Sequence, residues 1–328
     1  MGAFSPRRPA RVLGGLFADR DDPGLERLRA IQDPDEFIWA ILPHAARTFA
    51  ACIALLPERC VDATAVGYLY CRILDTYEDL HPDRAERESA LREFAARLDE
   101  PSPLPPAPPI PSSGAGDKRD LGHLLLVERC DRVDRVFERL DDEQRDAIRQ
   151  VVGDMAEGMC WSSETFERQG GVFEDEEQLA RYCRIVLGNP VVFTLRLLKG
   201  ERIDEGLRET GMQVGELVQC ANITRDIEKD LKRGVAYHPA LKPYLDSGDA
   251  PEEIVRTVRG EILRFALARA PAYTRMVESM NFPRVSFGRA SSVLMALFTD
   301  RYYRGCAARA GLPAWDGIRT TVGLLAQT

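Results

Sequence analysis

The sequence predicts an all-α protein, and three observations carry that prediction. From Asp35 onward, apolar residues recur at the three- and four-residue spacing of amphipathic helices. No sustained stretch alternates apolar with polar residues, and no hairpin dipeptide separates two strand-like runs. The chain has 328 residues and 45% hydrophobic content, which is enough to bury one large core. We therefore expect a single-domain helical bundle over residues 25–328.

The N-terminal half contains three predicted features before its first long interruption. Residues 1–24 are rich in Arg, Gly, Pro and Asp, so we expect them to be loosely ordered. A helical pattern begins at Asp35, and a second helix begins after Pro57. That helix should end before Pro82, because proline cannot continue a helix. A short, charged amphipathic helix is predicted at 84–99.

A proline-rich segment interrupts the helical pattern at residues 101–116. It contains seven prolines followed by serine and glycine, so it can be neither a helix nor a central strand. An interdomain linker and an extended surface loop both fit this composition, and we favour the loop because we expect the acidic motifs on either side to act together. Helical patterns then resume at 121–140, 142–160, 176–198, 203–232, 251–280 and 291–309.

Composition excludes several classes of function. The net charge of −8 and a pI of about 5.3 argue against nucleic-acid binding. The eight cysteines form no CxxC pair and lie within apolar helical patterns, so we expect reduced core residues of a cytoplasmic protein. The sequence contains no evident secretory signal and no uncharged apolar run of membrane-spanning length.

Two acidic clusters, each at the end of an apolar helical stretch, are the strongest signs of chemistry. In the first, Asp75 and Asp79 are four residues apart, with Glu78 beside them. One helical turn takes 3.6 residues, so these carboxylates should share one face. By itself, such a cluster is more often a solvated surface. The apolar residues in the preceding turns instead indicate a buried helix, and carboxylates at its end need partners.

The second cluster repeats this arrangement on another helix. Asn222, Asp226 and Asp230 step by four residues, with arginine and lysine interleaved. Salt bridges from Asp226 to Lys229, or from Asp230 to Arg233, would explain the charges without a ligand. Two matched sets of oxygen ligands favour a different explanation, in which Mg²⁺ joins carboxylates to a diphosphate and arginines contact its oxygens.

Both clusters resemble the aspartate-rich motifs of the squalene and phytoene synthase family. The run Tyr70–Asp79 is similar to the first motif, and Asn222–Gly234 is similar to the second. The resemblance extends over roughly 35–300. Three weaker matches occur in the family's order at Ala46–Phe49, Met155–Met159 and Tyr182–Gly188.

The resemblance implies an isoprenoid synthase fold around a central cavity, and head-to-head joining of two prenyl diphosphates. It implies that Asp75, Glu78 and Asp79 hold Mg²⁺ on one diphosphate, and that Asn222, Asp226 and Asp230 hold it on the other. Asp75, Asp79, Asp226 and Asp230 would then be catalytic, and the phosphate oxygens would contact Arg47, Arg72, Arg225, Arg233 and Asn222.

The resemblance also makes Tyr182 a candidate for guiding proton loss during cyclopropane closure. Without it, a buried tyrosine with a satisfied hydroxyl explains this residue equally well.

The motif Asp-Thr-Tyr-Glu-Asp is closer to squalene synthases than to phytoene synthases, so the resemblance favours two farnesyl diphosphates as substrates and squalene as product. NADPH would be needed if the second, reductive step occurs. A phytoene- or dehydrosqualene-type synthase without reduction is an alternative, because the part from Ser291 onward lacks a basic segment found near the nicotinamide site of squalene synthases. A helical Mg²⁺-dependent diphosphate hydrolase or binding protein is another. We expect a cytoplasmic protein, with transient contact at the membrane surface for release of a hydrocarbon product as a further hypothesis.

Overall fold

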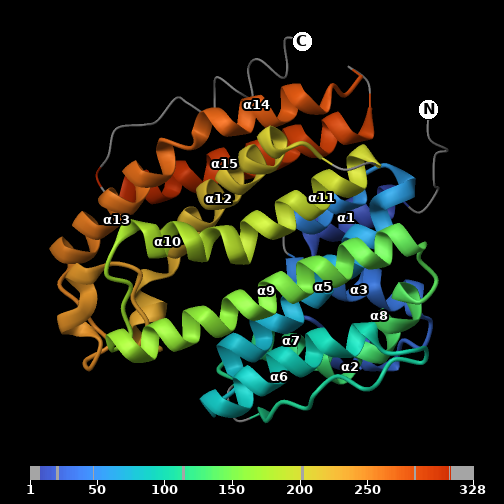
Figure 1. Ribbon diagram of the computed structural model, residues 1–328, viewed down its shortest axis with the longest axis horizontal. Coiled ribbons are helices and arrows are strands. Elements are labelled where there is room, and N and C mark those ends of the chain that lie inside the picture. Colours follow the sequence, from blue (N-terminus) through green and yellow to red (C-terminus); the bar gives the residue numbers. More distant parts are fainter. Residues whose placement is uncertain are drawn as a thin grey trace. The chain divides into compact units, whose positions relative to one another are not determined.

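The computed structural model describes residues 8–19, 22–46, 48–112, 115–200, 203–283, 286–309 and 311. The regular elements of these residues are helices (Figure 1), apart from one isolated bridge between Val172 and Ala236. The predicted all-α class is therefore confirmed. No helix in the described residues has both the length and the apolar character needed to cross a membrane.

The chain divides into two compact units. The first contains the chain up to Glu157, together with 193–202 and 285–291, and the second contains 158–192, 203–284 and the chain from residue 292 onward. The single domain predicted over residues 25–328 stays a prediction. The helices that begin in the first unit are α1 (Arg8–Phe17), α2 (Leu25–Ala30), α3 (Pro34–Ala46), α4 (Thr48–Ala54), α5 (Glu58–Leu80), α6 (Arg84–Ala96), η1 (Arg97–Asp99), α7 (Lys118–Glu128), α8 (Cys130–Phe137), α9 (Asp142–Gln169) and α15 (Phe287–Arg309).

Within the stretch 1–24, which was predicted to be loosely ordered, α1 forms a helix at Arg8–Phe17, and the prediction is corrected for these residues alone. Arg8 at its start is buried and forms an ion pair with Glu58 at 2.5 Å. Gly15 lies so close to α4 that a Cβ atom there would be 2.5 Å from the backbone nitrogen of Ala51. Gly15, one of the glycines that made this stretch look irregular in the sequence, thus allows close helix packing.

Helix α5, which carries the first acidic cluster, is fixed by a buried polar network. The Tyr70 side chain is fully buried, and its hydroxyl donates a hydrogen bond to Asp134 at 2.7 Å. Arg97 forms an ion pair with the same carboxylate at 2.8 Å, and its guanidinium lies 4.6 Å from the ring centre of Phe94. A buried charge is tolerated only when it is paired and hydrogen-bonded, and this network meets that condition.

The proline-rich segment contacts the same network. Arg97 donates a hydrogen bond to the carbonyl of Pro105 at 2.9 Å, and the Tyr77 hydroxyl donates to the carbonyl of Pro108 at 2.5 Å. The backbone N–H of Leu104 donates to the Glu138 carboxylate. The segment is extended and largely exposed, and it lies within the first unit, beside α5 and η1.

In the second unit, helix α12, which carries the second acidic cluster, contacts α10, η3, α13 and α14. Its approach to η3, a π-helical turn, is very close, because a Cβ on Gly215 would be 2.3 Å from the Cα of Gly188. Glu216 is buried and accepts hydrogen bonds from Arg184 and Arg269, each at 2.5 Å. The helices that begin in this unit are α10 (Glu176–Cys183), η3 (Arg184–Gly188), α11 (Asn189–Lys199), α12 (Glu205–Lys232), η4 (Pro239–Tyr244), α13 (Glu252–Leu267) and α14 (Ala270–Met280).

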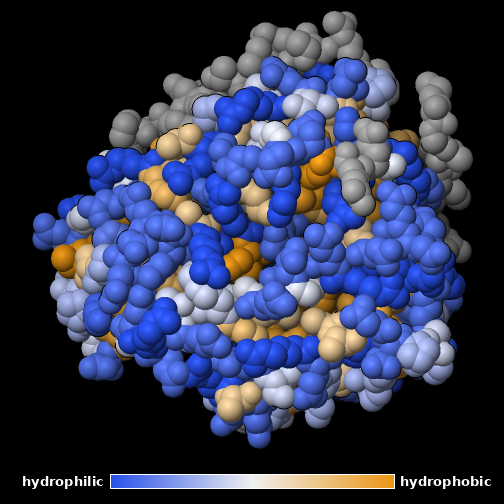
Figure 2. Space-filling view, viewed as in Figure 1, coloured by the Kyte–Doolittle hydropathy of each residue, from blue (hydrophilic) through white to orange (hydrophobic). Residues whose placement is uncertain are grey.

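The cysteines lie in the interior and hydrophilic residues lie on the surface (Figure 2), as the composition predicts. All eight cysteines are buried and free, as the sequence predicted. Hydrophilic residues cover most of the face seen in Figure 2. The cysteines therefore act as small apolar core residues, and the structure has no disulfide among the described residues.

We expect Asp134→Ala to lower the free energy of unfolding by about 3–5 kcal/mol, because it leaves Arg97 buried without its carboxylate. Asp146→Ala is the control, because Asp146 is 69% exposed in its ion pair with Arg149 and should contribute less than about 1 kcal/mol. Urea denaturation followed by circular dichroism measures both. Equal losses in the two variants would contradict the assigned role of the buried network.

Candidate functional site

The first acidic cluster lies on the last turns of α5, a continuous helix from Glu58 to Leu80. Along these turns the neighbouring apolar side chains are buried, whereas Arg72, Asp75, Glu78 and Asp79 are partly or fully exposed. Asp75 and Asp79 are one helical turn apart, so they lie on the same side of α5, as predicted. The arrangement puts carboxylate oxygens at the edge of an apolar core.

An arginine compensates the first of these carboxylates. Arg72 forms an ion pair with Asp75 at 3.0 Å and donates a hydrogen bond to the hydroxyl of Tyr68 at 3.3 Å. Only 24% of the Arg72 side chain and 26% of the Asp75 side chain are exposed. Burial, together with a smaller effect of the charge of Asp79, raises the pKa of Asp75 to about 6, although Arg72 acts to lower it. One guanidinium therefore compensates this cluster only in part, and an additional cation would be favourable.

The second acidic cluster lies on the last turns of α12. Asn222, Asp226 and Asp230 are half-buried, while Ile223 and Ile227 between them are buried. Asn222 donates a hydrogen bond to the side chain of Gln219 at 3.1 Å, and the backbone N–H groups after the helix donate to the Asp230 carbonyl. The step of four thus gives one polar stripe beside an apolar core.

Arg225 has the same role in the second cluster that Arg72 has in the first. Its Nε donates to Asp226 at 2.6 Å, and its Nη2 donates to the other oxygen of that carboxylate. Its guanidinium lies 5.1 Å from the ring centre of Tyr302, just as that of Arg72 lies 6.0 Å from the ring centre of Tyr68. Each cluster therefore combines carboxylates, an arginine and a tyrosine ring. Sequence reasoning missed both tyrosine contacts. Tyr68 lies one helical turn before Arg72, so helical spacing could have revealed that contact, whereas Tyr302 lies on a helix separate from that of Arg225.

Tyr182 lies on α10 within a group of aromatic rings. Its side chain is buried, and its hydroxyl accepts a hydrogen bond from the hydroxyl of Tyr237 at 3.2 Å. The rings of Phe173 and Tyr237 are 5.7 and 5.1 Å from its own, centre to centre. Phe166 stacks on Phe173 at 4.2 Å. This aromatic group was not predicted, because its members come from separate segments of the sequence.

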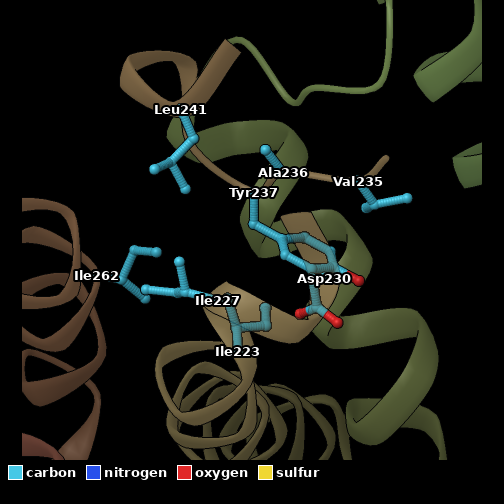
Figure 3. A pocket seen from close by; sticks show the side chains of 8 residues that line it. All are labelled: Ile223, Ile227, Asp230, Val235, Ala236, Tyr237, Leu241 and Ile262. Atoms are coloured by element: carbon cyan, nitrogen blue, oxygen red, sulfur yellow. The ribbon is translucent and has the colours of Figure 1, made fainter. Parts of the chain in front are cut away.

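Tyr237 connects the aromatic group to the second acidic cluster. It lines a small pocket together with Asp230 and six apolar residues (Figure 3). The only sequence signal for this residue is its position, seven residues after Asp230 and just beyond the end of α12. The apolar residues of the pocket are Ile223, Ile227, Val235, Ala236, Leu241 and Ile262.

Two further arginines, Arg233 and Arg47, were predicted to contact phosphate. Arg233 lies directly after the end of α12 and is exposed. Arg47 lies outside the described residues.

Within the described ranges, no three His, Cys, Asp or Glu side chains converge as a group that could hold a metal ion. Mg²⁺ commonly uses only one or two protein carboxylates and takes its other ligands from phosphate and water, so the oxygen donors of each stripe suit it chemically.

Comparison with proteins of known function identifies the family of this chain. Over 210 residues it is 28% identical to squalene synthase of Candida albicans, covering 61% of this chain and 44% of that protein. It is 28% identical to lycopaoctaene synthase of Botryococcus braunii over 214 residues, covering 61% of this chain and 43% of that one. Identity to 4,4'-diapophytoene synthase of Staphylococcus haemolyticus is 24% over 210 residues, or 64% of each chain. The chain thus spans less than half the length of the squalene synthases that it matches.

The fold has a solved counterpart in the complex of TcSQS with the ligand BPH1237. The TM-score is 0.60 at 19% identity, and the match covers 90% of this chain and 98% of that one. The predicted isoprenoid synthase-type fold is therefore confirmed. Residues 42–280 match the squalene/phytoene synthase family model, which includes both acidic clusters and Tyr182. The chain belongs to the squalene/phytoene synthase family.

Proposed function

We propose that this protein joins two farnesyl diphosphates head to head through presqualene diphosphate, and that it then forms squalene. The observation that carries the proposal is the pair of matched stripes on α5 and α12, each with an arginine bound to one of its carboxylates. Two diphosphate groups leave in this reaction, and each of the two sets of oxygen ligands would bind one of them through Mg²⁺. The motif Asp75–Asp79 supports the farnesyl substrate, because it resembles the corresponding motif of squalene synthases.

In this proposal, Mg²⁺ is held by Asp75, Glu78 and Asp79 on α5, and by Asn222, Asp226 and Asp230 on α12. The raised pKa of Asp75 supports a cation at the first set, because positive charge there would offset the burial of the carboxylate. When bound, Mg²⁺ supplies positive charge that stabilises the leaving diphosphate.

The arginines have a second task in the proposed reaction. Arg72 and Arg225 are bound to carboxylates of their own stripes, and each can move its guanidinium toward a phosphate oxygen once a cation neutralises those carboxylates. A guanidinium offers several N–H donors in one plane, which suits the oxygens of a diphosphate. The ring faces of Tyr68 and Tyr302 would help to stabilise the charges of the two guanidiniums.

Tyr182 is the proposed group for guiding proton loss when the cyclopropane ring closes. Its hydroxyl is buried among aromatic rings, which exclude water and offer their faces to a carbocation. A water-poor surrounding matters because water would trap the cation as an alcohol.

A second candidate function is a synthase that stops before reduction. The match to 4,4'-diapophytoene synthase favours it, because that match covers 64% of both chains, whereas the squalene synthase matches cover less of those proteins. Both candidates share the first reaction and differ in whether NADPH is used.

Incubation of the purified protein with farnesyl diphosphate and Mg²⁺, with and without NADPH, tests the proposal. Mass spectrometry of the extract should show squalene only when NADPH is present. Dehydrosqualene or presqualene diphosphate under both conditions would favour the second candidate. No turnover of farnesyl diphosphate or geranylgeranyl diphosphate would contradict both candidates and favour a diphosphate hydrolase or binding protein.

The charge at Asp75 should lower stability in the metal-free protein. Its folded-state pKa is about 6, above the ordinary 3.8, so ionisation disfavours the folded state above pH 6. The penalty is absent below about pH 4, where the carboxyl is protonated in both states. Asp75→Asn should therefore raise the free energy of unfolding at pH 8 by up to about 2–3 kcal/mol, and should change it little at pH 4.

Urea denaturation in the presence of a chelator measures this effect, with Asp146→Asn as the surface control. The same Asp75→Asn protein should lose at least about tenfold in turnover, because it loses a proposed metal ligand. Equal stability changes at pH 8 and pH 4, or a loss of stability at pH 8, would contradict the electrostatic account of this cluster.

A further inference from the structure

Tyr237 is held beside Tyr182 by the backbone as well as by its side chain. After α12 ends, the chain pairs with the segment that follows α9. The N–H of Ala236 donates to the carbonyl of Gly171 at 2.8 Å, and the N–H of Phe173 donates to the carbonyl of Ala236 at 3.0 Å. Gly171 has a φ of +86°, and a Cβ there would lie 2.5 Å from the carbonyl oxygen of Gly234. The residue before Tyr237 is therefore fixed in place.

The side chain of Tyr237 has a specific relation to that of Tyr182. The two ring centres are 5.1 Å apart, with an angle of 34° between the ring planes, and the Tyr237 hydroxyl donates to the Tyr182 hydroxyl at 3.2 Å. Phe173 lies 5.7 Å from both rings, and Phe166 lies 5.8 Å from Tyr237. Aromatic rings therefore flank the two phenols on several sides.

This hydrogen bond limits how the Tyr182 hydroxyl can turn. A phenol oxygen can accept a hydrogen bond and also donate its own proton. Because the two hydroxyls lie within hydrogen-bonding distance, the contact favours one orientation of the Tyr182 hydroxyl over the others. Tyr237 also lines the pocket that contains Asp230, so one side chain contacts both Tyr182 and the surroundings of the second acidic cluster (Figure 3).

We propose that Tyr237 is a positioning residue, which fixes the orientation of the Tyr182 hydroxyl during the reaction. The inference rests on the proposed function, since it assigns to Tyr237 an effect on the step that Tyr182 guides. A fixed hydroxyl is better aligned with the reacting atoms than one that rotates, and alignment acts on the rate of the bound complex more than on substrate binding.

Tyr237→Phe is the informative variant, because it removes the hydroxyl and keeps the ring in its aromatic surroundings. We expect kcat for formation of the first condensation product to fall by about tenfold, with KM for farnesyl diphosphate changed less than about twofold. In a Tyr182→Phe background, the same substitution should have no further effect on kcat, because no hydroxyl remains for Tyr237 to orient.

Tyr273→Phe is the matched control. Tyr273 is a buried tyrosine of the second unit, to which the half-buried Tyr237 also belongs, and its hydroxyl donates a hydrogen bond to the carbonyl of Ser292 at 2.8 Å. Its loss should reduce the melting temperature about as much as Tyr237→Phe does, with kcat unchanged. A general loss of packing would instead reduce kcat in both variants.

The outcomes separate this inference from the proposed function. If the wild-type protein converts neither farnesyl nor geranylgeranyl diphosphate, both are overturned. If the wild type is active and Tyr237→Phe has the kcat of the wild type, only the role of Tyr237 is overturned. The same holds if the Tyr237→Phe substitution lowers kcat as much in the Tyr182→Phe background as it does in the wild type. If Tyr182→Phe has no measurable turnover, the contrast in kcat and KM between Tyr237→Phe and Tyr273→Phe decides.

Discussion

Like charges on one face of a partly buried helix are the constraint on which the candidate site depends. Carboxylates one turn apart repel each other, and burial increases the cost of their charge. The protein meets this cost with one arginine in each cluster, Arg72 for Asp75 and Arg225 for Asp226. The pKa of about 6 at Asp75 indicates that the compensation in the first cluster is incomplete. In the proposed function, a divalent cation bound there would offset this residual cost.

The rest of each unit holds these helices in place. In the first unit, Asp134 joins Tyr70 on α5 to Arg97, and Arg97 also contacts the proline-rich segment. In the second unit, Glu216 on α12 joins Arg184 and Arg269. Both networks bury a carboxylate next to arginine, and each includes a side chain of the helix that carries an acidic stripe. Rigid helices keep the ligand oxygens in fixed positions, which a site for metal and diphosphate requires.

Helical periodicity was sufficient to predict the fold class and the acidic stripes. Asp75 and Asp79, or Asn222, Asp226 and Asp230, share a face because helix geometry dictates it. Helix α1 was missed because the Arg, Gly, Pro and Asp content of residues 1–24 was interpreted as a sign of loose order, whereas Gly15 allows α1 to approach α4 closely. The aromatic group around Tyr182 was missed for another reason, since it forms only when separate segments meet through the bridge between Val172 and Ala236. Local patterns cannot reveal such contacts.

The central claim is that each acidic stripe binds one diphosphate together with Mg²⁺. Isothermal titration with an unreactive thio-analogue of farnesyl diphosphate in the presence of Mg²⁺ tests it most directly. We predict two bound analogues per chain for the wild type, and one per chain when either Asp75 and Asp79, or Asp226 and Asp230, are changed to Asn. A stoichiometry unaffected by these changes, or equal binding after Mg²⁺ is removed with a chelator, would contradict the account.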